Sequence, residues 1–351
     1  NICKTKINYV ELGFRFSNKN KYFGPTGYTD DKLINSLKIY KNLKIGVMVN
    51  AADLIENNKP NLNKAKKILS NTKKIDFVRV ACHFHEIKKI KKILEWLSIK
   101  KINLMVNLMQ ISEMKEKVII DTIKVLNKYT IKVLYIADSL GSMNPKKINK
   151  ITNVIRKFWK YDLGFHAHDN LKLAFVNAKS AINANFKYID STIMGMGRGA
   201  GNLKTEQIYN YLNSNDKSGK NKINLIKKKI FLNLKKKYKW GTNKYYSYAA
   251  KNSIHPTYVQ ELISNKNLKN KDYLNILKSI KKIDAKRFNP NYLSMHDNEK
   301  KSTISNIEKK QFKKNVLIIG SSPILIKYKK LIETYIKKNR PTVICVNLNN
   351  Y

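Results

Sequence analysis

The sequence predicts an α/β fold, namely a TIM-type (β/α)8 barrel that lacks its first strand in this chain. Short apolar stretches alternate with amphipathic stretches, and seven such units follow one another at a spacing of roughly 30 residues. This alternation predicts a parallel sheet, which is either open or closed into a barrel. Polar residues recur at the C-terminal ends of many strands, which favours the barrel, because an open sheet gathers them at one switch point.

The seven expected strands are apolar runs at residues 7–14, 44–49, 76–81, 103–108, 132–138, 163–168 and 187–194. The first expected helix begins near Lys32. Further helices are expected at residues 64–71, in a Lys-rich stretch that ends at Ser98, and at residues 112–128, 145–159 and 203–212. Residues 1–6 are typical of the end of a helix that leads into a strand. We therefore expect the first strand–helix unit to lie upstream of this sequence.

Three segments are expected. Residues 1–213 form the barrel (strands 2–8), and residues 214–300 form a mainly helical extension. Residues 301–351 comprise a charged linker and the beginning of a further α/β domain of βαβ type, with strands near 316–320 and 341–346.

The composition limits the class of protein. Hydrophobic residues make up 42% of the chain, and no apolar run is long enough to span a bilayer, so we expect no membrane partner. Three widely spaced cysteines form neither a disulfide framework nor a CxxC metal site, which favours the cytoplasm.

The net charge of +46 does not predict specific nucleic-acid binding. Of the 70 Lys and Arg residues only six are Arg, and the lysines are spread over nearly every helix. Abundant Lys, Asn and Ile indicate an AT-rich coding bias, whereas nucleic-acid sites favour Arg at particular positions.

His166 and His168 are the strongest chemical signal. They lie one residue apart at the end of an expected strand, so both side chains point to the same face. Such a pair suits a divalent metal completed by oxygen ligands. The alternative is that backbone carbonyls satisfy both rings, but the small and polar neighbours favour the metal.

A glycine-rich loop, residues 195–201, follows the last expected strand. It is not a dinucleotide-binding fingerprint, because Ala200 stands where that motif requires Gly. Gly197 and Gly199 either help to bind an anionic substrate through backbone N–H groups or serve a tight turn. Asn202 is equally suited to cap the next helix or to offer its amide oxygen to the metal.

Other strand ends carry further candidates. Arg79, Asp138 and Ser139 could bind substrate or could be paired structurally. His83 is a further substrate-binding candidate. His255 and His296 have no supporting neighbours in the sequence, and we interpret them as structural.

Two motifs now make a resemblance specific: G-F-H-A-H-D-N-L-x-L-A-x-x-N-A from Gly164 and D-S-T-I-M-G-M-G-R-G-A-G-N-L-x-T-E from Asp190. They resemble those of the HMG-CoA lyase-like (DRE-TIM metallolyase) superfamily, and within it most of all those of the 4-hydroxy-2-oxovalerate aldolases. The isopropylmalate synthase branch, with H-C-H-N-D and G-x-G-E-R-A-G-N, fits less well. The resemblance covers residues 7–212.

The resemblance implies a TIM barrel that holds Mn²⁺ or Mg²⁺ through His166, His168 and, as in some members, Asn202. It implies a further ligand in an Arg-Asp motif on the first strand, which is absent from this sequence, so the chain as given is expected to be incomplete for activity. Glu11 matches a glutamate on the second strand of the family, and we expect it to be catalytic. Tyr246, with Tyr245 close behind it, matches a tyrosine that transfers a proton in the aldolases.

The expected function is that of a metal-dependent carbon–carbon lyase, an aldolase that acts on a 2-oxo acid and an aldehyde through a pyruvate enolate. The alternatives are an acyl-CoA-dependent Claisen condensing enzyme, like isopropylmalate or citramalate synthase, and a non-catalytic barrel scaffold. The sequence leaves open whether the protein forms a homo-oligomer.

Overall fold

The computed structural model describes residues 2–17, 24–38, 42–70, 74–100, 102–265, 268–281, 285–293, 315–320 and 325–346. These residues fall into two compact units, Asn1–Asn289 and Pro290–Tyr351. The expected linker and His296 lie outside the described residues.

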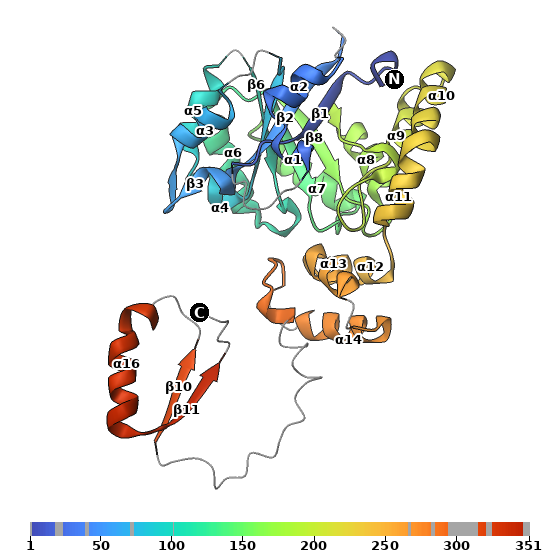
Figure 1. Cartoon of the computed structure of the whole chain (residues 1–351). Coiled ribbons are helices and arrows are strands. Elements are labelled where there is room, and N and C mark those ends of the chain that lie inside the picture. The colour runs from blue at the N-terminus through green and yellow to red at the C-terminus, as the bar shows by residue number, and fades with distance from the viewer. Residues whose placement is uncertain are drawn as a thin grey trace. The chain divides into compact units, whose positions relative to one another are not determined.

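The first unit is built on a seven-stranded parallel sheet that curls around an interior (Figure 1). In spatial order the strands are β1 (Tyr9–Phe14), β2 (Lys44–Asn50), β5 (Phe77–Cys82), β6 (Asn103–Leu108), β7 (Val133–Asp138), β8 (Asp162–Ala167) and β9 (Tyr188–Ile189). Because chain order equals spatial order and every pairing is parallel, the sheet winds in one direction, as in a TIM barrel. The predicted fold class is confirmed.

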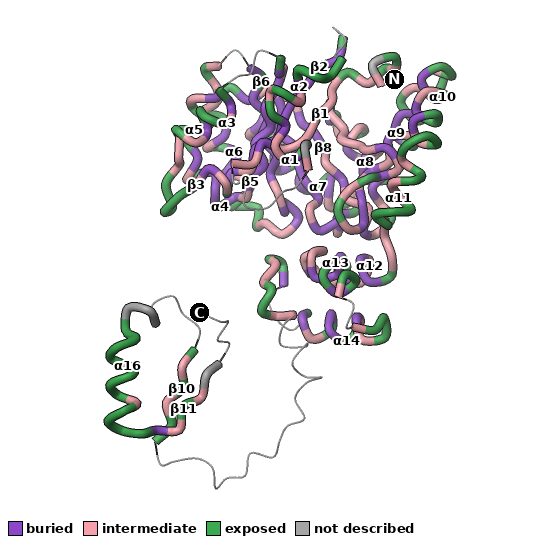
Figure 2. Tube along the Cα trace, viewed as in Figure 1, coloured by how far each residue is buried: buried purple, intermediate pink, exposed green. Residues whose placement is uncertain are grey.

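Helices connect the strands and lie on the outer side of the curved sheet (Figure 1). They are α1 (Pro25–Tyr28), α2 (Asp31–Ser36), α3 (Leu62–Ile68), α4 (Phe84–Ile87), α5 (Lys91–Ser98), α6 (Glu116–Leu126), α7 (Pro145–Arg156), α8 (Ala174–Asn183) and α9 (Thr205–Leu212). The main hydrophobic core lies between the sheet and these helices, where buried residues predominate (Figure 2). Outward residues of one strand, such as Val78 and Val80, are fully buried there.

The inner side of the sheet carries a separate apolar cluster formed by Phe77, Met105, Val133 and Tyr135. Alternation along each strand sends one set of side chains outward and the other inward. Tyr9 on the first strand and Tyr188 on the last pack against this cluster, with ring centroids 5.2 Å apart. The two edge strands are therefore joined by side chains, although they share no ladder of hydrogen bonds.

A helical extension completes the first unit, with α10 (Lys217–Ile226), a π-helix η5 (Lys227–Phe231), α11 (Leu232–Tyr238), α12 (Lys244–Lys251), α13 (Pro256–Ser264) and α14 (Asn270–Lys281). Thr242 Oγ1 and Ser247 Oγ both donate to the carbonyl of Asn170, in the loop after β8. These two bonds attach the part of the extension that follows α11 to the barrel, next to β8.

The second unit is small. It consists of β10 (Val316–Gly320), α16 (Leu325–Asn339) and β11 (Thr342–Val346), and the two strands pair in parallel. This is the strand–helix–strand arrangement that the sequence predicts for the start of a further α/β domain.

The strands agree with the predicted ranges except for the last one, and one helix also begins later than predicted. The last strand is much shorter than residues 187–194, because the chain turns into a 3-10 helix (Ile193–Gly195) in which Met194 is left-handed, at φ 54°. The helix expected from Ser112 begins at Glu116, because Gln110 is also left-handed (φ 55°) and is followed by a single 3-10 turn.

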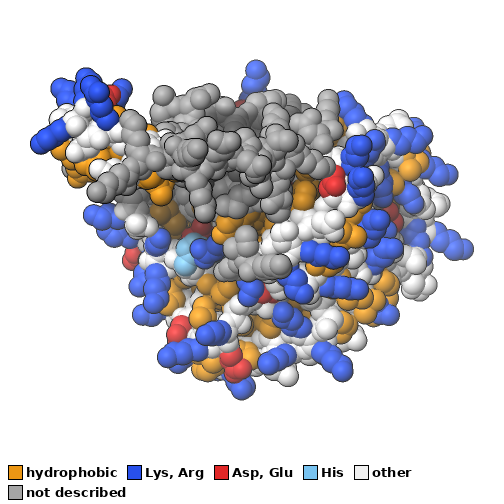
Figure 3. Space-filling model, turned by 90° about the horizontal axis from the view of Figure 1, so that it is seen from below, with side chains coloured by type: hydrophobic (Ala, Val, Ile, Leu, Met, Phe, Trp, Pro, Cys, Tyr) orange, Lys and Arg blue, Asp and Glu red, His pale blue; other side chains and the backbone are white. Residues whose placement is uncertain are grey.

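The surface bears the positive charge in dispersed form. Figure 3 shows Lys and Arg side chains scattered among other side chains over the visible described surface, without one continuous basic patch. None of the described helices is long and apolar enough to cross a membrane.

Candidate active site

His166 and His168 come together on the inner side of the sheet. His166 lies on β8 and faces inward, and His168 follows it two residues later with its backbone bridged to Asn202. The two ring centroids are 5.0 Å apart and the ring planes are nearly perpendicular. The predicted histidine pair is therefore present as a pair.

Each ring is oriented by a hydrogen bond at Nδ1. Nδ1 of His166 lies 2.9 Å from Oδ2 of Asp190, and Nδ1 of His168 lies 2.8 Å from the carbonyl oxygen of Asp138. Both partners are acceptors, so each Nδ1 carries the proton and donates it. Each Nε2 then has a free lone pair, which is the nitrogen arrangement that metal-binding histidines adopt.

Burial keeps His168 neutral. It lowers the pKa of the ring to about 3, and the nearby His166 and Arg198 act in the same direction, whereas the bond to Asp138 opposes them. A neutral imidazole is the form that binds a metal.

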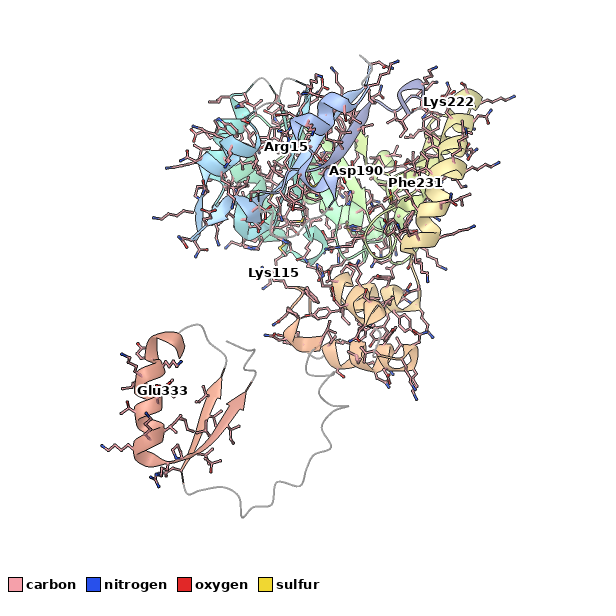
Figure 4. All side chains as sticks on the ribbon, viewed as in Figure 1. Arg15, Lys115, Asp190, Lys222, Phe231 and Glu333 are labelled. Atoms are coloured by element: carbon pink, nitrogen blue, oxygen red, sulfur yellow. The ribbon has the colours of Figure 1, made fainter. Side chains whose placement is uncertain are left out.

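Asp190 links the pair to a buried ion network. Figure 4 shows it beside the strands of the sheet, and its carboxylate contacts both His166 and Arg79. Nε of Arg79 also lies 2.6 Å from Oε2 of Glu11, and the guanidinium stacks over the Tyr135 ring at 4.5 Å. Burial raises the pKa of Asp190, but Arg79 and His166 outweigh it and lower the pKa overall, which keeps the carboxylate ionised.

This network changes the interpretation of Arg79, which the sequence offers as a substrate-binding candidate. Arg79 is only 5% exposed, and both of its carboxylate partners come from edge strands, Glu11 from β1 and Asp190 from the turn after β9. We infer that Arg79 holds the two edges of the sheet together and positions Asp190. The sequence shows Asp190 only as the first residue of the second motif, which indicates no role for it.

The glycine loop folds back onto the histidine strand. Asn202 N–H donates to the carbonyl of Gly195, and Asp169 N–H donates to that of Gly201, which brings Asn202 beside His168. The Asn202 amide nitrogen donates to Met196 O, so its oxygen Oδ1 faces the other way and has no donor within the described residues.

The two predicted glycines are required by close approaches. A Cβ at Gly197 would lie 2.7 Å from Nδ2 of Asn202, so any side chain there would displace the amide. Gly199 has φ +64°, and a Cβ there would lie 3.1 Å from the ring of Tyr246. The loop thus fits tightly between Asn202 and α12.

Asp138 and Ser139 act on their neighbours. The fully buried Asp138 carboxylate accepts N–H groups of Ser142 and Met143, while burial raises its pKa to about 6 against those bonds. Ser139 Oγ accepts the N–H of Gln110 at 2.9 Å. In this structure both residues support the loops around His168.

The two tyrosine candidates are separated by the structure. Tyr245 packs on Tyr273, and its hydroxyl donates to Asn270 O. Tyr246 instead lies over Gly199, and among the described residues its hydroxyl has no hydrogen-bond partner. Burial raises the pKa of Tyr246 to about 12, although Arg198 opposes this, so the hydroxyl keeps its proton at neutral pH.

His83 does not line the site of His166 and His168 but lies in a separate cavity, which His85 and His255 also line. His255, interpreted from sequence as structural, caps α13, where its side chain accepts Thr257 N–H. It also lines this cavity, and no spacing in the sequence connects it to residues about 170 positions away.

The described residues fit a divalent metal only in part. His166 and His168 provide two oriented nitrogens, and Asn202, whose backbone is bridged to that of His168, has an amide oxygen without a donor among the described residues. No group of three or more His, Cys, Asp or Glu side chains in the described ranges is placed to hold a metal. The candidate metal donors within this part of the chain are therefore two imidazoles and one amide oxygen.

Comparison with known proteins agrees with this geometry. Residues 41–230, more than half of the chain, match the family described as HMGL-like. The chain belongs to the HMGL-like family. This confirms the resemblance that the two motifs indicate.

Similar proteins include carbon–carbon lyases. The chain is 23% identical to an oxaloacetate decarboxylase of Mycobacterium tuberculosis over 202 residues, 57% of each chain. It is 32% identical to 4-hydroxy-2-oxovalerate aldolase 2 of Rhodococcus opacus over 132 residues, 38% of each chain. It is 38% identical over 88 residues to a 4-hydroxy-2-oxovalerate aldolase of Carboxydothermus hydrogenoformans, 25% of this chain and 26% of that one.

Among solved structures, the N-terminal domain of an aldolase candidate from Bacteroides vulgatus superimposes with a TM-score of 0.67 at 28% identity. The superposition covers 76% of this chain and 88% of that one. The curated relatives above are matched over 26–57% of their own length. Family membership is thus clear, whereas a specific reaction requires its own argument.

Proposed function

We propose that this protein is a divalent-metal-dependent carbon–carbon lyase of the aldolase type, which cleaves or forms 4-hydroxy-2-oxo acids through a pyruvate enolate. One observation carries the proposal. The Nδ1 protons of His166 and His168 are both engaged, by Asp190 and by Asp138 O, and this leaves two Nε2 lone pairs on the inner side of the sheet.

In this proposal His166, His168 and the amide oxygen of Asn202 hold Mn²⁺ or Mg²⁺. When bound, such an ion acts as a Lewis acid that stabilises negative charge on the oxygens of a 2-oxo acid. Asp190 keeps the His166 ring in its ligand orientation, and Arg79 keeps Asp190 ionised.

Proton transfer to the aldehyde oxygen is assigned to Tyr246. Its hydroxyl is protonated at neutral pH, has no partner in the described structure, and lies above the glycine loop that carries Asn202. In condensation the protonated hydroxyl acts as general acid toward the aldehyde oxygen, and by microscopic reversibility its tyrosinate form accepts the proton of the 4-hydroxyl group in cleavage. Glu11 remains a catalytic candidate, held at present by Arg79.

Decarboxylation of oxaloacetate is a second candidate, favoured by the similarity to the decarboxylase of M. tuberculosis. The loss of CO₂ from oxaloacetate also leaves a pyruvate enolate, so the same histidine pair would serve. The leaving group distinguishes the two reactions, because the 4-hydroxyl group must lose its proton when an aldehyde leaves, whereas a carboxylate leaves as CO₂ without a proton transfer.

The test uses the full-length protein loaded with Mn²⁺. Pyruvate methyl protons should exchange with deuterium in D₂O, and 4-hydroxy-2-oxo acids should yield pyruvate plus aldehyde. EDTA should abolish both reactions. Absence of exchange and of pyruvate release, despite bound Mn²⁺, would exclude the proposal. Release of CO₂ from oxaloacetate without any aldol cleavage would establish the decarboxylase instead, and a strict requirement for acetyl-CoA would indicate a condensing enzyme.

A further inference from the structure

A cavity of about 280 Å³ lies where the carboxyl ends of two strands meet the helical extension. Its lining comprises His83, His85, Gln110, His255, Arg287 and Phe288. His83 follows β5, Gln110 follows β6, and His255 precedes α13. The cavity is therefore formed jointly by the barrel and the extension of the first unit.

The lining offers hydrogen-bond donors and positive charge, and no carboxylate. Arg287 is the permanent cation, and its guanidinium makes no ion pair with a carboxylate within the described ranges; its Nη2 lies 3.4 Å from Nδ1 of His85. The two nearest carboxylates are already engaged. Glu86 accepts His83 N–H through Oε2 and lies 4.0 Å from His85 Nε2 through Oε1, and Glu113 lies 3.1 Å from Lys286 Nζ. An anion would thus meet no repulsion from the lining itself.

Two imidazoles have their protons fixed on Nε2. Nδ1 of His255 accepts Thr257 N–H at 3.3 Å, so the neutral ring carries its proton on Nε2. Nδ1 of His85 faces Arg287, which can only donate, so His85 is protonated on Nε2 as well. Because His85 Nε2 lies 4.0 Å from Glu86 Oε1, the donors left for an oxyanion such as carboxylate or phosphate are the Arg287 guanidinium and the His255 N–H.

The cavity is connected to the histidine pair through Gln110. This residue is 6% exposed and left-handed, a conformation that is uncommon for residues other than glycine and is often found at functional sites. Its N–H donates to Ser139 Oγ, and its Nε2 donates to Lys286 O. Asp138, the neighbour of Ser139, holds His168 through its carbonyl oxygen. The segment that contains Asp138 and Ser139 therefore contacts both the cavity wall at Gln110 and the histidine pair at His168.

We propose that this cavity binds an anionic end group, a carboxylate or a phosphate ester, on the aldehyde that reacts with pyruvate. The inference rests on the proposed aldolase function and names its acceptor class. Arg287 and His255 bind the oxyanion, and Gln110 positions the cavity wall beside His168.

Acceptor preference gives the first test. The Mn²⁺-loaded full-length protein is assayed with pyruvate and matched pairs of aldehydes: succinate semialdehyde against butanal, and glyceraldehyde 3-phosphate against glyceraldehyde. At least one anionic member should show a kcat/KM about tenfold or more above its neutral partner, as expected for a charge-assisted hydrogen bond. The pair with the larger ratio identifies carboxylate or phosphate. Equal values in both pairs overturn the proposal.

Variants connect the preference to the cavity. Arg287→Gln, at an exposed side chain, should remove most of the anionic preference through KM, and Arg287→Lys should restore part of it. Lys278→Gln, on α14, is the matched control and should keep the preference. Retention of the full preference in Arg287→Gln overturns the proposal.

A binding measurement separates this inference from the aldolase function. Inorganic phosphate and acetate are titrated into the protein without pyruvate, and the imidazole NMR signals of His83 and His255 are followed. Anion-dependent shifts support the site if the apparent anion affinity falls about tenfold in Arg287→Gln and, followed at His83 alone, in His255→Asn. Asn keeps a cap acceptor at position 255 but removes the Nε2 donor. Absence of these shifts overturns the site, whereas shifts without pyruvate deuterium exchange support the site and reject the aldolase.

Discussion

His166 and Asp190 are joined by a hydrogen bond of 2.9 Å between Nδ1 and Oδ2, and this bond connects the candidate metal site to the closure of the sheet. Asp190 lies just after the last strand, and its second partner, Arg79, also holds Glu11 of the first strand. The same carboxylate thus orients a ligand ring and takes part in joining the two edges. Ligand geometry and sheet closure should respond together to changes at this position.

The change Asp190→Asn tests this relationship. It leaves an acceptor for His166 but removes one of the two negative charges that neutralise buried Arg79. We expect Mn²⁺ affinity to fall about 10–100-fold and the free energy of unfolding to fall by roughly 3 kcal/mol. Isothermal titration with Mn²⁺ and urea unfolding measure the two effects. Asp121→Asn, at an exposed carboxylate on α6, is the control; equal behaviour of the two variants would contradict the assigned role.

The tyrosine pair offers a matched comparison. Tyr246→Phe should lower the rate of aldol cleavage by about 10²–10⁴-fold while pyruvate deuterium exchange continues, because only cleavage requires a proton to be removed from the 4-hydroxyl oxygen. Tyr245→Phe removes a hydroxyl that is bonded to Asn270 O, so it should lower stability slightly and leave cleavage intact. Steady-state kinetics and methyl exchange by NMR check both. A reversed order of effects would assign the proton transfer to Tyr245.

Gly199→Ala should disturb the loop. The residue is at φ +64°, and the new Cβ would lie 3.1 Å from the Tyr246 ring. The left-handed backbone alone costs about 1–2 kcal/mol with a side chain present, and a shift of Tyr246 should also slow cleavage. Thermal unfolding and kcat are the measurements. A variant as stable and as active as the parent would show that the loop is not constrained by this contact.

Stability should fall in acid partly through His255. Burial, with Arg198 and His83 acting in the same direction, lowers its pKa to about 4. The pKa of His255 in the unfolded chain is about 6.5, so below this pH the unfolded chain binds a proton that the folded chain does not bind. Stability is therefore lost as the pH falls from about 6.5 to 4. The loss from this group amounts to up to about 3 kcal/mol. His255→Asn should make the dependence shallower by about one proton in urea unfolding at a series of pH values, and an unchanged slope would show that His255 titrates normally in the folded state.

Local pattern was sufficient for much of the fold. The alternation of apolar and amphipathic stretches predicted every strand of the sheet. The outer face of each strand packs against helices, so its side chains must be apolar whichever strands lie next to it. The 3-10 turns after Gln110 and Thr192 were not predicted. Their left-handed residues, Gln110 and Met194, are neither Gly nor Asn, so no turn signal marks them.

The candidate site shows the same division. The sequence by itself determined the His166–His168 pair, since a spacing of two on a strand places both rings on one face in any fold. It also identified the glycines that allow Asn202 and Tyr246 to approach. Only the tertiary structure decided that Arg79 and Asp138 support other groups, that Asp190 orients His166, and that His255 shares a cavity with His83. These roles depend on which strands become neighbours when the sheet curls, and contacts between residues up to about 180 positions apart in sequence leave no local pattern to read.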